Sequence, residues 1–215
     1  MLNKSKGNMY PWVTHTWNVA KGKCPHDCSY CYMKRYPQSE LYFDAKACNT
    51  NLGYGNTIFV GSSCDLWATT IEPSWIEATL GVCRKYANAY LFQSKNPERF
   101  IGQLFPEFTT LGCTIETNRV YPAISKAPNG LRRKMAMEVL TLPKMISIEP
   151  IIDFDLPDMV RWIEDIAPDF VSIGADSGNN HLPEPSPSKV RELITELQAI
   201  TEVKIKDNLT RLAQR

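Results

Sequence analysis

Three of the seven cysteines, Cys24, Cys28 and Cys31, stand in the short stretch KGKCPHDCSYCYMKRY. Thiolates are soft ligands that select zinc, copper(I) or iron–sulfur clusters. The spacing C-x3-C-x2-C lets three thiolates from one tight loop converge on a single centre. Three ligands leave one coordination position open, which is how catalytic metal sites admit another molecule. The spacing therefore predicts a metal centre with an open position.

A structural zinc site completed by a fourth protein ligand is the competing interpretation. His26 lies between two of the cysteines, so its ring cannot easily turn inward beside both. Cys48 is far enough along the chain to fold back onto the loop. A disulfide framework is disfavoured, because an odd number of cysteines without an export signal more often binds metal or does chemistry.

Length and composition indicate one globular domain. The chain has 215 residues, of which 43% are hydrophobic and 22% charged, and its net charge is +1. This length suits a single α/β domain, and the balanced charge provides no global basic field for nucleic acid. No segment approaches the roughly 20 apolar residues of a membrane span, and the first residues hold no signal-peptide run. We therefore expect a cytoplasmic protein without a membrane partner.

The elements that must position the cysteines follow a repeated strand–helix rhythm. Runs rich in β-branched and aromatic residues predict strands at residues 14–20, 56–63, 89–94, 111–117, 144–152, 169–175 and 203–208. Amphipathic stretches predict helices at residues 73–87, 96–105, 129–142, from about 156, and from a cap at Ser186 or Ser188 to Ile200. Repeated βα units imply a parallel sheet, either open and doubly wound or closed as a full or partial barrel.

The carboxyl ends of the predicted strands are polar, and both kinds of sheet place their sites at that edge. The ends read GSSCD, QSK, IETNR, SIEP, GADSG and KDN. A functional site at this edge would have such a lining. Strand ends that meet solvent are also polar, so the structural interpretation stays open for each of them.

The C-x3-C-x2-C spacing with an aromatic residue, Tyr30, before the third cysteine is identified as the signature of the radical S-adenosylmethionine (SAM) superfamily. The resemblance implies a parallel (β/α)6-type partial TIM barrel that forms a single domain over residues 1–215. It also implies that Cys24, Cys28 and Cys31 bind a [4Fe–4S] cluster whose fourth iron is chelated by SAM. In that family the reduced cluster cleaves SAM to a 5′-deoxyadenosyl radical that abstracts hydrogen from a substrate. The electron comes from a donor such as flavodoxin or ferredoxin.

The strand ends resemble a narrower group within that superfamily. FQSKNPERF, CTIETN, ISIEPII and VSIGADSG are similar to the elements TKRPER, VSVEN, SIEPLL and VGGESG of short phage-associated radical SAM-like proteins of poorly defined function. That group is distantly similar to spore photoproduct lyase-like enzymes, and the resemblance runs from about Trp17 to Asn208. It implies a nucleobase or nucleotide substrate in thymidine-type DNA modification. Asp176 stands where the group often has glutamate, a difference that concerns the substrate more than the cofactor.

The same resemblance implies which strand ends contact SAM. The expected contacts are Tyr30 beside the cluster, Gly61, Ser62 and Ser63 to the methionine amino group, Ser94 and Lys95 to its carboxylate, Glu116 to the ribose hydroxyls, and Gly174 to the adenine. Glu149 would meet SAM or the substrate, or would be a structural ion-pair partner. A solvated lysine, a surface carboxylate and a turn glycine are the corresponding structural interpretations of Lys95, Glu116 and Gly174.

Residues that would act on the substrate are harder to identify. The candidates are Asp176, Lys206 and Asp207, and one sequence does not rank them. Cys64 follows the second predicted strand and is expected to face the site, as a hydrogen-atom donor of the photoproduct-lyase-like kind or as a buried thiol. Cys83 and Cys113 lie on apolar faces and are expected in the core.

Nucleic-acid binding has its own candidate residues. Trp67 follows the second strand and is the most plausible platform for base stacking, whereas Trp75 and Trp162 lie on predicted helices and are expected to pack. The basic run LRRKMAME could touch phosphates or form a solvated helix face. Besides a radical SAM enzyme, two function classes remain: a non-catalytic iron–sulfur or zinc protein, and a nucleic-acid-binding module with a structural metal centre.

Overall fold

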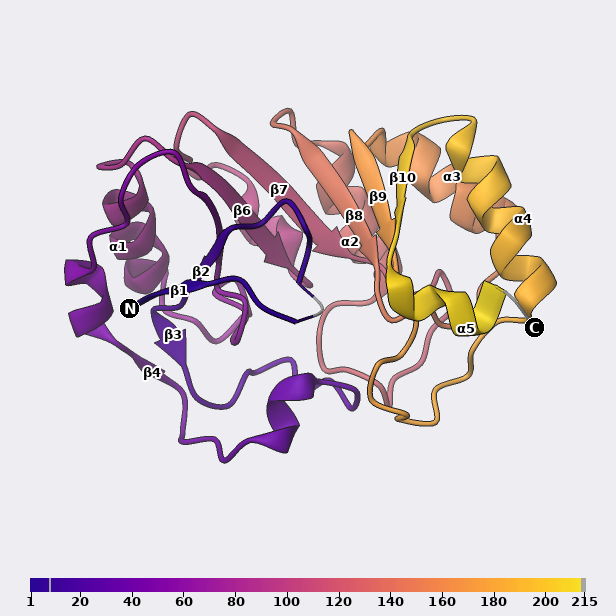
Figure 1. Ribbon diagram of the computed structural model, residues 1–215, viewed down its shortest axis with the longest axis horizontal. Helices are drawn as coiled ribbons and strands as arrows, with labels where there is room; N and C mark the ends of the chain where they lie inside the picture. The colour runs from indigo at the N-terminus through magenta and orange to yellow at the C-terminus, as the bar shows by residue number, and fades with distance from the viewer. Residues whose placement is uncertain (8, 214–215) are drawn as a thin grey trace.

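The computed structural model describes residues 1–7 and 9–213. In this part of the chain an eight-stranded sheet has the order β1-β2-β5-β6-β7-β8-β9-β10 (Figure 1). The strands are β1 (Leu2–Lys4), β2 (His15–Trp17), β5 (Thr57–Val60), β6 (Ala89–Ser94), β7 (Thr109–Thr114), β8 (Lys144–Ile148), β9 (Phe170–Ile173) and β10 (Glu202–Ile205). A separate antiparallel pair joins β3 (Ala20–Lys21) to β4 (Tyr42–Phe43).

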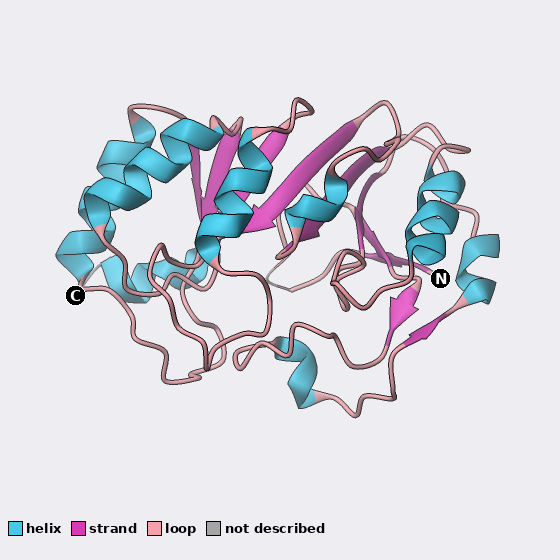
Figure 2. Cartoon of the chain, turned by 180° about the vertical axis from the view of Figure 1, so that it is seen from behind, coloured by secondary structure: helices cyan, strands magenta, loops and turns pink. Residues whose placement is uncertain are grey.

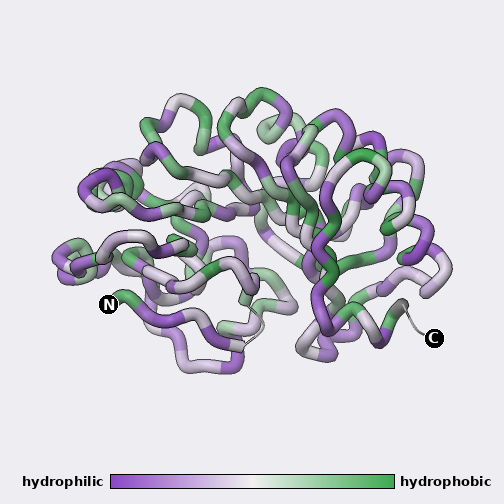
Figure 3. The backbone as a smooth tube through the Cα atoms, turned by 45° about the horizontal axis from the view of Figure 1, so that its top comes forward, coloured by the Kyte–Doolittle hydropathy of each residue, from purple (hydrophilic) through white to green (hydrophobic). Residues whose placement is uncertain are grey.

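The large sheet is mostly parallel and open. Each neighbouring pair from β2 to β10 is parallel, and β1 adds to β2 in the antiparallel sense. β1 and β10 form its two edges, and Figure 3 places the ends of the chain on opposite sides of the molecule. The predicted α/β fold with a mostly parallel sheet that does not close is thus confirmed. Within the described residues, no helix combines the length and the apolar character that crossing a bilayer requires.

Helices follow most of the parallel strands and cover one face of the sheet, as Figure 2 shows from behind. They are α1 (Pro73–Cys83), α2 (Gly130–Glu138), α3 (Leu156–Ile166), α4 (Pro187–Gln198) and the short α5 (Thr210–Ala213). The short 3-10 turns are η1 (Tyr32–Arg35), η2 (Ala45–Asn49), η3 (Pro97–Phe100) and η4 (Asp207–Leu209). Apolar side chains at helical spacing bury this face: Met159, Ile163 and Ile166 in α3, and Val190, Leu193 and Leu197 in α4.

Helix ends carry the predicted signals. The Ser186 hydroxyl accepts a hydrogen bond from the backbone N–H of Lys189, which caps α4. Asn129 caps α2 through the N–H of Arg132 in the same way. Proline stands at the first helical position of α1 and α4 and at the second of α3, where its missing N–H costs no helical hydrogen bond.

The other face of the sheet has no helix against it among the described residues, and the N-terminal segment packs there instead. Tyr10 and Val13 form a small core with Leu91 of β6 and Met145 of β8. Successive strand residues point to opposite faces, so Leu91 faces this side while its neighbours Tyr90 and Phe92 face the helices. Polar side chains occupy this helix-free face near the carboxyl ends of the strands.

Two predicted elements are wrong in detail. The helix expected at residues 96–105 is only the turn η3, because the chain becomes extended at Ile101 and Gly102 then adopts a positive φ of 78°. The strand expected at residues 14–20 breaks after Trp17, and its last residues pair with β4 in the separate sheet. The antiparallel strand β1 has the mostly polar sequence LNK and gave no strand signal.

Candidate active site

The three clustered cysteines line one cavity of about 240 Å³. Two tight turns bring them together: the Asp27 N–H donates to the Cys24 carbonyl and the Cys31 N–H to the Cys28 carbonyl, both at 3.1 Å. Each thiol is free of any disulfide. Lys23, Asp27, Lys34, Tyr36 and Gln38 complete the lining of the cavity. Among the described residues, no three His, Cys, Asp or Glu side chains are placed to share a single metal ion.

The two residues considered as a fourth zinc ligand are engaged elsewhere. His26 is buried, and its Nε2 lies 2.8 Å from Asp65 Oδ2. Cys48 lies in η2 and packs against the main core, and its thiol is close enough to Lys85, which follows α1, to feel the charge of that side chain. Neither residue lines the cavity. The structure therefore does not complete a four-ligand site from them.

The segment after β7 supports the cysteine loop. The Ser29 N–H donates to the Ile124 carbonyl at 2.8 Å, and the Lys126 N–H donates to the His26 carbonyl at 2.8 Å. The Ser125 hydroxyl lies 3.2 Å from Cys28 Sγ. These backbone contacts, on either side of Cys28, set the path of the loop.

Beside the loop, a layer of polar side chains crosses the helix-free face of the sheet. Thr114, Ser147 and Ser172 stand opposite one another on β7, β8 and β9 and so share that face. Gln93 of β6 joins them by donating from Nε2 to Thr114 Oγ1 at 3.0 Å. The hydroxyl of Tyr10 reaches the layer from the N-terminal segment, 3.0 Å from Gln93 Oε1 and 3.1 Å from Ser147 Oγ.

Two residues further along the strands, Glu116 forms a buried charge network. It is 6% exposed, and Lys95 Nζ and Arg133 Nη1 each lie 2.6 Å from one of its carboxylate oxygens. Tyr30, from the cysteine loop, donates its hydroxyl to the same carboxylate. Burial would raise the pKa of Glu116, but the charges of Lys95 and Arg133 outweigh it and hold that pKa well below the usual range.

This network involves three residues for which the sequence analysis had other expectations. The sequence predicted that Lys95 and Glu116 contact different parts of SAM, whereas the structure pairs them with each other. Arg133 was expected on a solvated or phosphate-binding face. Its guanidinium is instead buried, and it also donates to the Thr114 and Pro128 carbonyls at 2.8 and 2.6 Å.

A second ion pair lies on the β8–β10 side of the same face. Lys206 Nζ is 3.0 Å from Glu149 Oε2, and the Ser172 hydroxyl donates to Glu149 Oε1 at 2.5 Å. A Cβ on Gly174 would stand 3.1 Å from Glu149 Cγ and 3.2 Å from Lys206 Cδ. Of the two roles expected for Glu149, the structure shows the ion pair. Gly174 makes room for it, and the Lys206 ammonium lies 4.8 Å from the centre of the Tyr10 ring.

The loop after β5 is arranged by Asn18, which follows β2. Its Oδ1 accepts from the Ser63 N–H at 3.0 Å, and its Nδ2 donates to the Ser62 hydroxyl at 3.3 Å. Gly61 has a φ of 82°, which a glycine adopts without strain. The three residues expected to meet the methionine amino group therefore form one ordered turn at the strand end.

Asp65 connects this turn to the end of β6. Its Oδ2 accepts from the Ser94 hydroxyl and from the Lys95 N–H, each at 2.9 Å, besides facing His26. Burial would raise the pKa of Asp65, but its pKa is lowered because the neighbouring His26 charge and the backbone donors favour the ionised form. Ser94 is thus used within the protein, and Asp65 is a site residue that the sequence analysis missed.

Burial corrects the expectation for Trp67, and Asp176, a candidate contact to the substrate, is engaged within its own loop. Trp67 is fully buried among Phe92, Phe100 and Phe105, so it cannot stack on a base. Asp176 accepts from the N–H groups of Gly178 and Asn180 at 2.9 and 2.5 Å. Its pKa is lowered because these donors outweigh burial, and its carboxylate braces its own loop.

The remaining cysteines are buried. Cys64 lies beside Cys24, and its hydrogen bond is the main cause that lowers the pKa of the Cys24 thiol to about 6. Cys64 therefore belongs to the surroundings of the cysteine loop and not to the polar layer. Cys83 and Cys113 are core residues, as predicted. Asp207 is exposed at the start of η4, and Lys206 is the residue of this segment that reaches the site.

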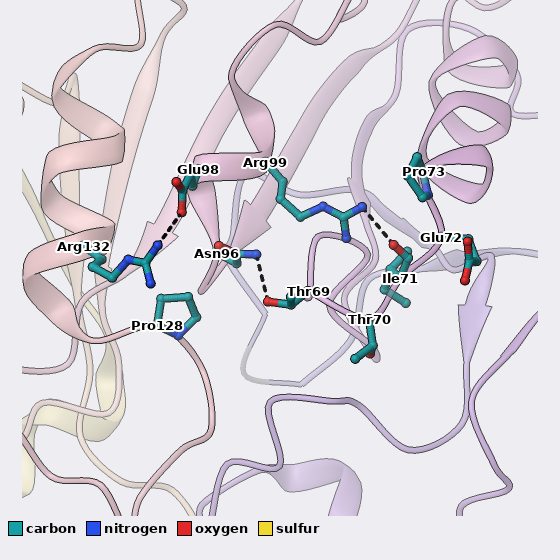
Figure 4. Close-up of a pocket in the computed structure, with 10 residues that line it drawn as sticks. All are labelled: Thr69, Thr70, Ile71, Glu72, Pro73, Asn96, Glu98, Arg99, Pro128 and Arg132. Carbon is teal, nitrogen blue, oxygen red and sulfur yellow. Dashed lines mark hydrogen bonds and ion pairs between the residues drawn. The ribbon is translucent and has the colours of Figure 1, made fainter.

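A larger cavity of about 480 Å³ lies away from the cysteines, between η3 and the starts of α1 and α2 (Figure 4). Arg132 points to Glu98 at 3.2 Å, and Arg99 donates to the Ile71 carbonyl at 2.8 Å. The Asn96 amide faces the Thr69 hydroxyl at 3.5 Å. These contacts account for Glu98, Arg99 and Arg132 of the lining without a ligand.

The polar layer had a signal in the sequence that the analysis did not use. Within otherwise apolar strands, polar residues recur two positions apart in QSK, TIE and SIE, which end at residues 95, 116 and 149. A period of two places both members on one face of a strand. Gln93, Thr114 and Ser147 could have been identified from this pattern. Tyr10 and Asn18 had no comparable signal.

No protein-family model matches the chain, and no curated protein matches it. Solved structures of spore photoproduct lyase do match. A cysteine-to-alanine variant with dinucleoside spore photoproduct has a TM-score of 0.59 at 10% identity, over 90% of this chain and 63% of that one. A double variant with bound AdoMet and the same dinucleoside has a TM-score of 0.57 at 10% identity, over 90% and 64%. This chain therefore spans less than two thirds of the length of those enzymes, and the likeness shows that its fold is similar to the radical SAM fold.

Proposed function

We propose that the chain is a radical SAM enzyme in which Cys24, Cys28 and Cys31 bind a [4Fe–4S] cluster. The observation that carries this proposal is the single cavity lined by three free thiols at the carboxyl edge of a parallel sheet. The donor set fits such a group, because soft thiolates from a tight loop are the usual ligands of iron–sulfur clusters. Lys23 and Lys34 line the same cavity and would offset part of the thiolate charge.

When bound, a cluster of this kind supplies the electron that generates a 5′-deoxyadenosyl radical from SAM. The chain's own task is to hold SAM at the strand ends next to the loop. The turn of Gly61, Ser62 and Ser63 offers backbone and hydroxyl groups to the methionine amino group. Lys95 can turn from Glu116 to a ligand carboxylate without leaving the buried carboxylate unpaired, because Arg133 remains with it.

The proposed substrate is a nucleobase or nucleotide. Solved proteins of similar fold are described with a dinucleoside, which supports this class. We propose that Glu149 and Lys206 contact it, since they present one acceptor and one donor on the helix-free face, where the Lys206 ammonium lies over the Tyr10 ring. A nucleobase edge offers the complementary donor and acceptor groups. The resemblance to phage-associated proteins stays a prediction.

An acidic flavodoxin or ferredoxin is the proposed electron donor. Lys23, Lys34 and Arg35 are exposed on the cysteine loop and give this face a basic character that supports the choice. Association steered by such charges is expected to weaken as the ionic strength rises.

The test is anaerobic reconstitution with iron and sulfide, followed by metal analysis and electron paramagnetic resonance (EPR) with and without SAM. We expect wild type to bind a [4Fe–4S] cluster, to change its EPR signal on addition of SAM, and to form 5′-deoxyadenosine when reduced. Cys24→Ala, Cys28→Ala and Cys31→Ala should each lose all three properties, whereas Cys48→Ala is the matched control that keeps them.

Other outcomes would assign the chain to a different class. Metal analysis that finds one zinc and no iron would overturn the proposal and indicate a protein with a structural metal. A cluster whose EPR signal ignores SAM, together with salt-dependent DNA binding, would indicate a nucleic-acid-binding module with a structural centre.

A further inference from the structure

The Tyr30 side chain connects the cysteine loop to the charged residues at the end of β7. It stands between Cys28 and Cys31, and its hydroxyl donates to the Glu116 carboxylate. The Lys95 ammonium lies 5.2 Å from the centre of its ring, so both the hydroxyl and the ring face are held. One side chain thus links the segment that carries two thiols to strands β6 and β7.

The anchor for this side chain is rigid and stays charged. Glu116 is buried against Arg133, and Arg133 is itself fixed by the Thr114 and Pro128 carbonyls. A neutral phenol that donates to a buried carboxylate is a charge-assisted hydrogen bond, which is stronger than a neutral one.

We propose that Tyr30 is a positioning residue whose hydroxyl, through Glu116, holds the Cys28–Cys31 segment in the geometry that retains the cluster. The consequence for the cluster rests on the proposed function, whereas the fastening of the loop does not. Other contacts support the loop on both sides of Tyr30: the N–H groups of Ser29 and Lys126 bond backbone groups before it, and the Tyr32 hydroxyl donates to the Ser62 carbonyl after it. Removing the Tyr30 hydroxyl should therefore loosen the segment from Cys28 to Cys31 while the ring still packs.

The experiment compares Tyr30→Phe with wild type and with two controls. Tyr32→Phe removes a hydroxyl from the same loop that donates to the Ser62 carbonyl at 3.1 Å from a half-exposed side chain. Val190→Ala removes buried volume under α4 and lowers global stability away from the loop. The reconstituted proteins are measured for amide hydrogen exchange at residues 24–36, for the rate of iron loss to a chelator, and for the EPR line shape with SAM.

We expect the loop amides of Tyr30→Phe to exchange about tenfold to hundredfold faster than in wild type, the range that follows from losing a hydrogen bond to a charged group. Its cluster should lose iron faster and show an altered EPR signal, while Tyr32→Phe and Val190→Ala match wild type in both. Unchanged loop exchange and iron loss in Tyr30→Phe would overturn the inference. If Val190→Ala lost iron as fast as Tyr30→Phe, the effect of the Tyr30 hydroxyl would be one of global stability, and the positioning role would fail.

The proposed function and the inference fail separately. If wild type binds no cluster, the proposed function fails, and loop exchange measured on the cluster-free chain still decides whether Tyr30 fastens the loop. If wild type binds the cluster and Tyr30→Phe behaves identically, only the positioning role fails.

Discussion

Glu116→Gln is the substitution that most directly tests the charge network at the end of β7. It removes the single carboxylate that faces both Lys95 and Arg133 but keeps the shape of the side chain. Arg133 is 5% exposed and cannot turn to solvent without unfolding its surroundings. The neutral amide would leave two cations close together with no counter-charge.

The expected cost follows from that burial. Breaking one side of a buried ion pair costs about 3–5 kcal/mol, and the retained amide oxygen should reduce this to about 2–4 kcal/mol. That is a large part of the roughly 5–15 kcal/mol by which native proteins are stable. With a urea dependence of about 3 kcal/mol per molar for a chain of this size, the midpoint should fall by roughly 1 M. Urea unfolding of the whole chain, followed by circular dichroism, measures this shift.

Glu98→Gln is the matched control. Glu98 also pairs with an arginine, Arg132, but both side chains are largely exposed, at 59% and 65%. Exposed pairs contribute about 0–1 kcal/mol, so its midpoint should hardly move. If Glu116→Gln proved as stable as Glu98→Gln, the network would not be the buried anchor that the structure describes, and the reasoning about Tyr30 would lose its basis.

Three further predictions concern the same edge of the sheet. Because the pKa of Glu116 is lowered in the folded chain, its ionised form stabilises the fold above the ordinary value of 4.5, and this stabilisation is lost as the pH falls toward the folded pKa. The difference in unfolding free energy between wild type and Glu116→Gln should therefore be constant above about pH 5.5 and shrink below pH 4.5, and a difference that grew toward acid would contradict the assignment. Asp65→Asn should lower the melting temperature by several degrees, because one neutral oxygen replaces a buried charge that serves side-chain and backbone donors, and differential scanning calorimetry would show it. Gly174→Ala should cost about 1–3 kcal/mol in urea unfolding, because the added Cβ crowds the neighbouring ion pair. Gly81→Ala, whose Cβ would meet nothing closer than 3.8 Å, should be neutral or stabilising by up to about 1 kcal/mol.

Local patterns were sufficient to predict most of the fold. Most parallel strands after β2 are short apolar runs, and α3 and α4 show the apolar spacing that buries one face. The failures arose where a local turn or a neighbouring strand overrides the pattern. The chain leaves the helix predicted after β6 at Ile101 and Gly102, and the polar strand β1 pairs with the edge of β2.

The location of the site could be predicted from the sequence, but the contacts between its side chains could not. The sequence placed polar residues at the strand ends, yet which of them pair depends on side chains from distant segments. α2 shows why: Leu131 and Met135 are exposed while Arg133 is buried, the reverse of the usual preference. No periodicity argument selects the second arginine of LRRK as the partner of Glu116.

The charges at the strand ends divide the edge of the sheet into two unequal halves. Near the cysteine loop, Lys95 and Arg133 face one carboxylate, Glu116, so that these three side chains together carry a net positive charge. On the β8–β10 side, Glu149 and Lys206 balance each other. A buried positive surplus favours anions, and the nearest groups that gain from it are the thiolates of the cysteine loop and the carboxylate of an incoming ligand. The half with Glu149 and Lys206 offers a hydrogen-bond donor and an acceptor but attracts neither anions nor cations. It therefore suits the edge of a neutral base better than a phosphate.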